Sequence, residues 1–365
     1  MSTTASYCPA ALQEIGEYYG RYLHVPSTII ICFFGTIFNL LNLLVFIKKP
    51  MTPPPNLVFF HLALVDFLDL LARFLFAGLK FTYYHDPEKQ LTYYWWAVLK
   101  IWYNTLVTTV HLMSVFLTVM LTLWRYIAVV HPLKERQWCS MKITRNLVIA
   151  GYIICIIVLG IPTYLSREIV TENVNQTTIY KPKYKKSPIM RRTPNIVKGV
   201  MGRLLPAVVL AWLTYRLIVI LIARKTHQEQ LTQSASVGNQ MKTAKMNQQI
   251  SKSTSILFTV VALFFIAEFP KGILSLLRII YNEKATVIRK ECFTSLQTMF
   301  QVIVNFNISI TFVVYYTLSH QFRITFKSMF SCKSVSNKQT TVVSDDIKET
   351  DVSCTTTDVC SSINV

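Results

Sequence analysis

Hydrophobic residues in this chain gather in seven long runs, which are separated by polar and mostly basic segments. The runs cover residues 27–47, 57–79, 97–123, 147–165, 199–222, 255–277 and 293–317. A helix needs about 20 largely apolar residues to cross the hydrocarbon core of a bilayer, and each run meets or approaches that length. The pattern predicts an all-α membrane protein, with a seven-transmembrane helix bundle within residues 27–330.

A shorter amphipathic segment follows the seventh run. Its aromatic residues recur at every fourth position, at Phe322, Phe326 and Phe330. This spacing places them on one helix face, so the pattern predicts a short amphipathic eighth helix in the membrane interface. Cys332 follows directly, where a palmitoyl group would anchor that helix; an unmodified thiol is the alternative. Residues 331–365 are polar and rich in Ser and Thr, which predicts a disordered tail.

Two of the connecting segments are long. Residues 166–198 form a basic loop in which three prolines argue against one continuous helix. The same loop carries a glycosylation sequon at Asn175. Residues 224–254 are rich in Gln, Ser, Thr and Lys, and we expect them to extend the fifth and sixth helices.

The charge of the chain bears on its orientation. The formal net charge is +19, yet only 15% of residues are charged and 52% are apolar, whereas a soluble protein has roughly a quarter charged residues. Because the basic residues lie in loops, we expect no nucleic-acid partner. Basic loops after runs one, three and five favour a cytoplasmic C-terminus, with residues 1–26 as an extracellular segment of a multi-pass plasma-membrane protein. The basic loop 166–198 would then lie outside, against this rule, although its sequon agrees with that placement.

The end of the third run carries the most specific motif. Residues 124–126 read Trp-Arg-Tyr, and residues 131–133 read His-Pro-Leu. An Arg at the mouth of a membrane helix can simply snorkel to the interface, so its position alone is weak evidence. With the seven runs, the motif resembles the third helix of rhodopsin-like G-protein-coupled receptors. Residues 124–129 and the Glu-Phe-Pro of residues 268–270 are similar to invertebrate myosuppressin and FMRFamide-like peptide receptors and to nematode serpentine receptor class W.

This resemblance implies a receptor that couples an extracellular ligand to a heterotrimeric G protein, Gi/o-like by the same resemblance. Arg125 and Tyr126 would contact the G protein. The matching parts elsewhere are Pro206, Pro270 and Tyr315. Trp124 stands where the family usually has an acidic residue, so the salt bridge that holds Arg125 in the family is not available here. Further expected partners are membrane lipid, a receptor kinase and arrestin at the tail, and a PDZ protein at the C-terminal Ile-Asn-Val.

Polar residues inside membrane helices are costly and therefore mark functional sites. Asp66, Ser114 and Asn307 fall where the family builds a sodium pocket, and a hard cation binds several oxygens. The implied cofactor is thus an allosteric sodium ion at most. A protonated Asp66 in an ordinary hydrogen-bond network is the alternative interpretation.

Glu268 stands where most relatives of this superfamily carry Trp, two residues before the proline of the sixth run. A carboxyl at that depth is paired, protonated or in contact with water. Pairing with Lys271, one turn along the helix, is the structural interpretation; Asp69 and Arg73 have similar i, i+4 spacing. The functional interpretation is a ligand pocket. Its candidate residues are Asp69, Arg73, Thr108, His111, Arg203, Glu268, Lys271 and Gln301.

Cysteines are absent where the superfamily usually bridges the third helix to the second outer loop. Lys100 occupies the helix position, and residues 166–198 contain no Cys. Cys8 and Cys292 are the remaining candidates for an outer disulfide; two free thiols are the alternative.

Other function classes fit less well. The seventh run lacks the Lys of a retinal photoreceptor, no nucleophile or metal cluster points to an enzyme, and no repeat points to a transporter. The chain is therefore interpreted as a non-enzymatic receptor, with a channel or transporter as the remote alternative. Peptides that end in Arg-Phe-amide are cationic while the outer loop is basic. The resemblance implies a neuropeptide ligand, FMRFamide-like or myosuppressin-like. The charge mismatch adds two alternatives, which are an acidic or neutral peptide and a chemosensory receptor for an environmental small molecule.

Overall fold

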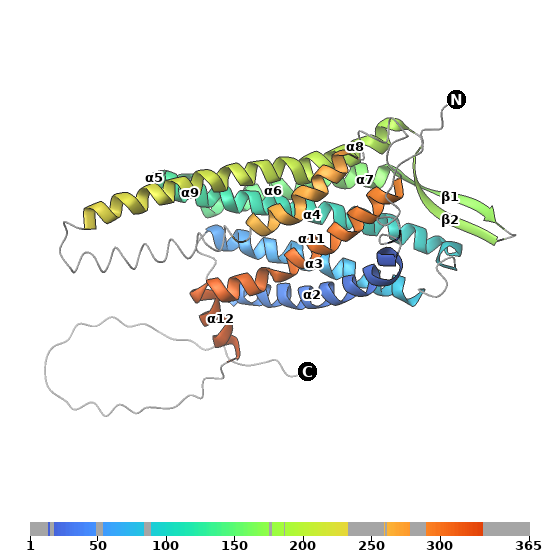
Figure 1. Cartoon of the computed structure of the whole chain (residues 1–365), viewed down its shortest axis with the longest axis horizontal. Helices are drawn as coiled ribbons and strands as arrows, with labels where there is room; N and C mark the ends of the chain where they lie inside the picture. The colour runs from blue at the N-terminus through green and yellow to red at the C-terminus, as the bar shows by residue number, and fades with distance from the viewer. Residues whose placement is uncertain are drawn as a thin grey trace, which may run out of the picture. The chain divides into compact units, whose positions relative to one another are not determined.

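In the part of the chain that the structure describes, each of the seven apolar runs contributes to a long helical segment (Figure 1). The computed structural model describes residues 14, 18–48, 54–83, 89–174, 177–185, 187–232, 259, 261–277 and 290–330. The first three segments are α2 (His24–Lys48), α3 (Pro54–Thr82) and α4 (Tyr94–Val130). The fourth comprises α6 (Met141–Cys155), η3 (Ile156–Gly160) and α7 (Ile161–Leu165). The fifth comprises α8 (Pro188–Gly199), η4 (Val200–Leu204) and α9 (Leu205–Thr232), the sixth is residues 261–277, and the seventh is α11 (Lys290–Leu318).

Shorter elements join these segments. Short turns lie at η1 (Tyr19–Leu23) and η2 (Lys89–Thr92), and the short helix α5 (Pro132–Trp138) connects α4 to α6. The helix α12 (His320–Phe330) follows α11 as the predicted eighth helix. Contacts divide the chain into residues 1–330 and residues 331–365; the second unit lies outside the described residues, so the disordered tail stays a prediction.

Lipid exposure explains the outer surface of the bundle. Among the described residues, five helices are long and apolar enough to cross a membrane: His24–Lys48, Tyr94–Val130, Met141–Leu165, Thr193–Ala223 and Leu296–Thr317. Large apolar side chains face outward along them; Ile153, Ile154 and Ile157 are each more than half exposed. A soluble monomer rarely shows apolar surface on this scale. The chain is thus a multi-pass membrane protein with the predicted helix bundle.

The central position in the bundle belongs to α4. It contacts α3, α6 and α9 as well as both strands of the hairpin described below. Buried side chains from these helices, such as Leu62, Leu117, Leu121 and Leu210, form the largest hydrophobic cluster. Functional side chains on α4 are therefore surrounded by several other helices.

Glycine brings α2 and α11 close together. A Cβ atom at Gly35 would lie 2.1 Å from Oγ of Ser309, so only glycine permits this approach. Across the contact, Nδ2 of Asn39 donates to the Ile308 carbonyl at 3.3 Å, and Oγ of Ser309 donates to the Ile31 carbonyl at 3.2 Å. These bonds fix the position of the seventh helix against the first.

Three π-helical turns occur just before prolines. The turns η1, η3 and η4 each contain the residue four positions before Pro26, Pro162 or Pro206. Proline lacks an N–H, and its ring clashes with the carbonyl of that residue in a regular α-helix. A wider turn relieves the clash, and such π turns are frequent at functional sites. Pro270 differs, because the described helix of residues 261–277 continues through it as α-helix.

The long loop 166–198 forms a hairpin followed by a helix. Strands β1 (Arg167–Val174) and β2 (Thr177–Tyr184) pair antiparallel, with Arg167 opposite Tyr184. On the hairpin, Lys181 donates to Glu172 at 3.0 Å, and Lys183 contacts the other oxygen of that carboxylate. Hydrogen bonds from Lys183 and Lys181 lower the pKa of Glu172 below its ordinary value. The hairpin therefore neutralises part of its own positive charge.

The eighth helix is present, but its aromatic face packs against protein. Phe322 is only 2% exposed and lies 5.8 Å, between ring centroids, from Phe46 of α2. Phe326 contacts the ring of Phe312 at 5.5 Å. The predicted eighth helix is therefore confirmed, and these two rings pack against the ends of α2 and α11. Its position in the membrane interface stays a prediction.

Candidate functional site

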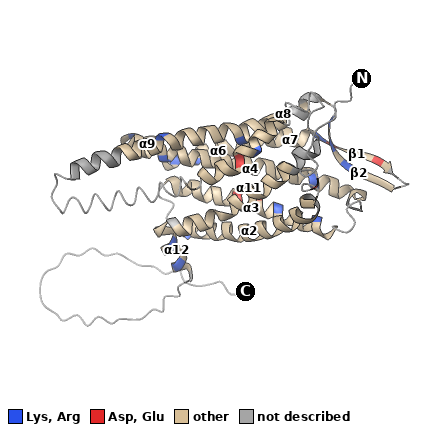
Figure 2. Ribbon diagram, in the orientation of Figure 1, with Lys and Arg blue, Asp and Glu red and all other residues tan. Residues whose placement is uncertain are grey.

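Positions of Lys, Arg, Asp and Glu are sparse along the ribbon of the bundle (Figure 2), and a few of these residues are buried. Asp69 and Glu268 are each 1% exposed, while Arg73, Arg203 and Lys271 are at most 6% exposed. Ionised groups at this depth persist only where they are paired or hydrogen-bonded. Their partners therefore show what the site can do.

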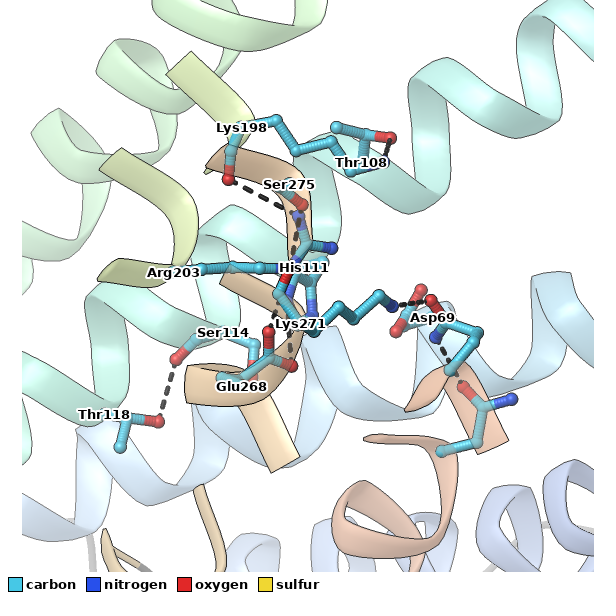
Figure 3. Close-up of polar contacts among 12 residues, drawn as sticks. Asp69, Thr108, His111, Ser114, Thr118, Lys198, Arg203, Glu268, Lys271 and Ser275 are labelled. Carbon is cyan, nitrogen blue, oxygen red and sulfur yellow. Dashed lines mark hydrogen bonds and ion pairs between the residues drawn. The ribbon is translucent and has the colours of Figure 1, made fainter. Parts of the chain in front are cut away.

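Glu268 is held from two other segments of the bundle (Figure 3). Nε of Arg203 donates to Oε2 at 3.2 Å, and Nε2 of His111 lies 3.3 Å from Oε1. The interpretation that Glu268 is paired with Lys271 inside its own helix is wrong. Nζ of Lys271 instead donates to Oε1 of Gln301. The carboxylate thus ties residues 261–277 to η4 and α4.

Backbone geometry makes the contact between Arg203 and Glu268 possible. Arg203 lies in the π turn η4, which Pro206 imposes on the fifth segment. On the facing helix, a Cβ at Gly272 would lie 2.8 Å from Cδ2 of Leu204 and 3.2 Å from Cβ of Arg203. Glycine at this position lets the two backbones approach, so that the guanidinium reaches the carboxylate.

The remaining pocket candidates lie in two groups around that contact. Thr108 accepts a hydrogen bond from Nζ of Lys198 at 3.1 Å, and the Lys198 carbonyl accepts one from Nη1 of Arg203 at 3.5 Å. Gln301 donates onward from Nε2 to Oδ1 of Asn305 at 2.9 Å. Side-chain and backbone contacts thus join four of the eight candidates, Thr108, His111, Arg203 and Glu268, and link Lys271 to Gln301 in a second group.

Asp69 and Arg73 form an ion pair of their own. Nε and Nη2 of Arg73 each donate to a different oxygen of Asp69 at 3.1 Å. This two-point geometry is the strong form of the guanidinium–carboxylate contact. Neither residue hydrogen-bonds to Glu268 or its partners. Mutual neutralisation within α3 therefore accounts for the burial of this pair.

Sequence reasoning missed Lys198. It ends a basic loop and precedes the fifth apolar run by one residue, so it resembles an exposed loop cation. The helical segment α8–η4–α9 begins earlier than the apolar run and carries Lys198 into the bundle. The only sequence signal was its position five residues before Arg203.

A small cavity connects the proposed sodium site with Glu268. Oγ of Ser114 donates to Oδ1 of Asp66 at 2.7 Å. Asp66, Ser114 and Asn307 line the cavity together with His111 and Glu268, and its volume is about 40 Å³. That is space for about two or three waters. Carboxylate, hydroxyl and amide oxygens around such a volume suit a hard cation.

The opposite end of α4 holds the Trp-Arg-Tyr motif. Trp124 is 5% exposed, and its Nε1 donates to Oγ1 of Thr144 on α6 at 3.1 Å. Arg125 is partly buried and has no carboxylate within ion-pair distance among the described residues. The ring of Tyr126 lies 6.3 Å from that of Trp212. Trp124 therefore joins α4 to α6 and leaves Arg125 without a charged partner in the described part of the chain.

Tyr315 lies at the same end of the bundle. Its ring packs edge-on against Phe46 and Phe59, at centroid distances of 5.9 and 5.3 Å. Its hydroxyl is buried without a hydrogen-bond partner among the described residues. Four further candidates lie outside the described residues or have side chains that are not described: Cys8, Asn175, Cys292 and Cys332.

Comparison with known proteins places the chain in a family. Residues 26–333 match the family described as "Serpentine type 7TM GPCR chemoreceptor Srw". The chain is 23% identical over 356 residues to the G-protein coupled receptor dmsr-1 of Caenorhabditis elegans, covering 84% of this chain and 68% of the relative. It is 25% identical over 355 residues to the Sex peptide receptor of Drosophila melanogaster, covering 91% and 76%. It is 24% identical over 328 residues to Sex peptide receptor-related protein 2 of Caenorhabditis elegans, covering 85% and 71%.

Proposed function

The chain belongs to the serpentine seven-transmembrane G-protein-coupled chemoreceptor family Srw, and on that premise we propose that its extracellular ligand is a peptide. The observation that carries the proposal is the buried polar set around Glu268. It brings charges of both signs, with hydroxyl, amide and imidazole groups, to one place between four helical segments. Such a set suits a ligand with several polar groups of both kinds.

The alternative is a receptor for an environmental small molecule. The family description contains the word chemoreceptor, which keeps this alternative in view. One matched relative, the Sex peptide receptor of Drosophila melanogaster, is named for a peptide. The peptide reading is therefore the stronger one, and a screen of both ligand classes on one cell line separates them.

The first test measures guanine-nucleotide exchange in membranes that contain the receptor and a heterotrimeric G protein. A panel of amidated neuropeptides is applied at equal concentration, and we expect at least one of them to stimulate exchange. Arg125→Ala should abolish that response at unchanged surface level, because Arg125 carries the coupling role. Stimulation of undiminished size in Arg125→Ala would contradict this assignment.

Coupling to a Gi/o-type G protein is tested by pertussis toxin, which should remove the exchange response.

Orientation and modification belong to the same proposal. We expect the N-terminus and Asn175 outside, so Asn175→Gln should remove a glycan and lower the apparent mass of the receptor.

A disulfide between Cys8 and Cys292 is tested separately. If the two are bridged, peptide mapping without reduction should recover them linked; alkylation of both thiols without reduction would exclude the bridge. These assignments rest on sequence positions alone.

Shut-off and anchoring are proposed for the tail. Residues 334–362 are rich in Ser and Thr and include five acidic residues, and phosphorylation by a receptor kinase would make this segment an anionic ligand for arrestin. Truncation after Lys333 should slow internalisation. Deletion of the last three residues tests a PDZ partner, and Cys332→Ser tests the palmitoyl anchor.

A further inference from the structure

The buried charges around the proposed ligand site do not balance. Two of the buried carboxylates already have arginine partners: Asp69 is held by Arg73 at 3.1 Å, and Glu268 by Arg203 at 3.2 Å. His111 adds a second contact to Glu268 at 3.3 Å. The third buried carboxylate, Asp66, accepts a hydrogen bond from Ser114 at 2.7 Å.

Two lysines remain beside these pairs. Lys271 is 6% exposed, and among the described residues it donates only to the neutral amide oxygen of Gln301. Lys198 is partly buried and donates to the hydroxyl of Thr108 at 3.1 Å. Among the described residues, neither ammonium group has a carboxylate within ion-pair distance. An ammonium group carries three N–H donors, so each lysine has donors beyond these single neutral acceptors.

The two lysines flank one cluster (Figure 3). The Lys198 carbonyl accepts from Arg203, Arg203 binds Glu268, and Lys271 lies one helical turn beyond Glu268. An enclosed cation without an anion is unfavourable, because burial removes water and nothing of opposite sign replaces it. An anion that arrives between them would supply the missing charge.

We infer that the ligand presents a carboxylate to Lys198 and Lys271. The inference rests on the proposed function, in that the site described above is the ligand site. A carboxylate has two acceptor oxygens and can bind two ammonium groups at once, and charge-assisted hydrogen bonds of this kind are stronger than neutral ones. The group is either an acidic side chain or a free C-terminus.

The test uses small probes and full-length receptor purified into lipid nanodiscs. N-acetyl-aspartate methylamide carries a side-chain carboxylate, N-acetylglycine carries a terminal one, and N-acetyl-asparagine methylamide is the neutral control. The thermal unfolding midpoint is followed against probe concentration. In the wild type, one carboxylate probe should bind at least ten-fold more tightly than the neutral probe, and the better of the two identifies the source. Equal binding of the neutral probe would overturn the inference without any variant.

Variants then locate the site. Lys198→Gln and Lys271→Gln should each weaken carboxylate binding at least ten-fold, whereas Lys271→Arg keeps the charge and should retain it. Lys100→Gln is the matched control, because Lys100 is exposed on α4 and should leave binding unchanged. If a variant that combines Lys198→Gln with Lys271→Gln still prefers the carboxylate probe, the anion binds elsewhere and the inference is wrong. The same conclusion follows if Lys100→Gln weakens carboxylate binding as much as the site variants do.

A peptide arm separates this inference from the proposed function. Active peptides are compared in pairs, with Asp or Glu against Asn or Gln, and with a free against an amidated C-terminus. In at least one of these pairs, the peptide without the carboxylate should be at least ten-fold less potent in nucleotide exchange than the peptide that carries it. If peptides without any carboxylate signal as well as their carboxylate-bearing counterparts, the inference is wrong and the assignment as a peptide receptor stands. If no peptide signals, the peptide assignment fails and the probe measurement still decides the question of the carboxylate.

Discussion

At the scale of the residue, Glu268 has the largest expected effect on stability. Glu268→Gln leaves the guanidinium of Arg203 buried without its carboxylate, and breaking a buried pair in this way destabilises proteins by about 3–5 kcal/mol. We expect a lower unfolding midpoint for the purified receptor and a lower surface level in cells. Thermal unfolding and surface labelling measure the two effects.

The partner of Glu268 is identified by rescue. Arg203→Met in the Glu268→Gln background should restore most of the lost stability, because it removes the orphaned charge. Lys271→Met in the same background should not, since Lys271 contacts Gln301 instead. Equal rescue by both substitutions would show that charge in the region matters and the direct pair does not.

Trp124 offers a second test at this scale. Trp124→Phe keeps a ring in the buried position and removes the hydrogen bond to Thr144, which is worth about 0.5–1.5 kcal/mol. We expect a small drop in the unfolding midpoint and a change in basal nucleotide exchange, since α4 is then held less firmly to α6. Thr144→Val removes the same bond from the other side and is the matched variant. Different effects of the two would show that the ring contact of Trp124 is the important one.

Several site residues could be predicted from sequence, but their pairings could not. Polar residues in apolar runs identified Asp66, Glu268 and Lys271, because burial in a membrane makes them conspicuous. The i, i+3 spacing offered a pair between Glu268 and Lys271 as one alternative. The actual partner, Arg203, depends on a π turn and on the space at Gly272, which are tertiary features that no local spacing reports.

At the scale of the element, the π turn η4 is the feature to perturb. Pro206→Ala restores an N–H and removes the ring that clashes with the preceding turn, so residues 200–204 should relax to regular α-helix. Arg203 would then rotate relative to Glu268. We expect the same loss of stability as in Arg203→Gln, and no additional loss when the two are combined. Additive losses would mean that Pro206 acts by another route.

Helices and hairpin differ in how well the sequence predicted them. Each helical segment was visible because lipid demands a long apolar run, and the run itself is the signal. The hairpin of β1 and β2 was not predicted, since the prolines of this loop excluded one helix without indicating strands. Its contact with α4 is a tertiary feature, as in the edge-on packing of Tyr94 and Tyr180 at 5.5 Å.

At the scale of the whole molecule, sodium should stabilise the receptor if the site at Asp66 binds it. A ligand that binds only the folded state stabilises it by RT ln(1 + [L]/Kd), about 2.7 kcal/mol at 100 Kd. We expect a higher unfolding midpoint in sodium chloride than in potassium chloride at equal ionic strength. Asp66→Asn should remove the difference, and Asp69→Asn serves as the acidic control. An identical salt response in wild type and Asp66→Asn would favour the alternative of a protonated Asp66.

The placement of the partners of Glu268 also bears on how the chain is made. When a translocon inserts a helix into the membrane, a central Asp, Lys or Arg raises the insertion free energy by about 2.5–3.5 kcal/mol. Residues 261–277 carry two charged residues, Glu268 and Lys271. Chains emerge from the ribosome N-terminal part first, so α4 and η4 precede the sixth helix. His111 and Arg203 are then already in the membrane when Glu268 arrives. The order of synthesis thus supplies the compensating groups before the helix that needs them.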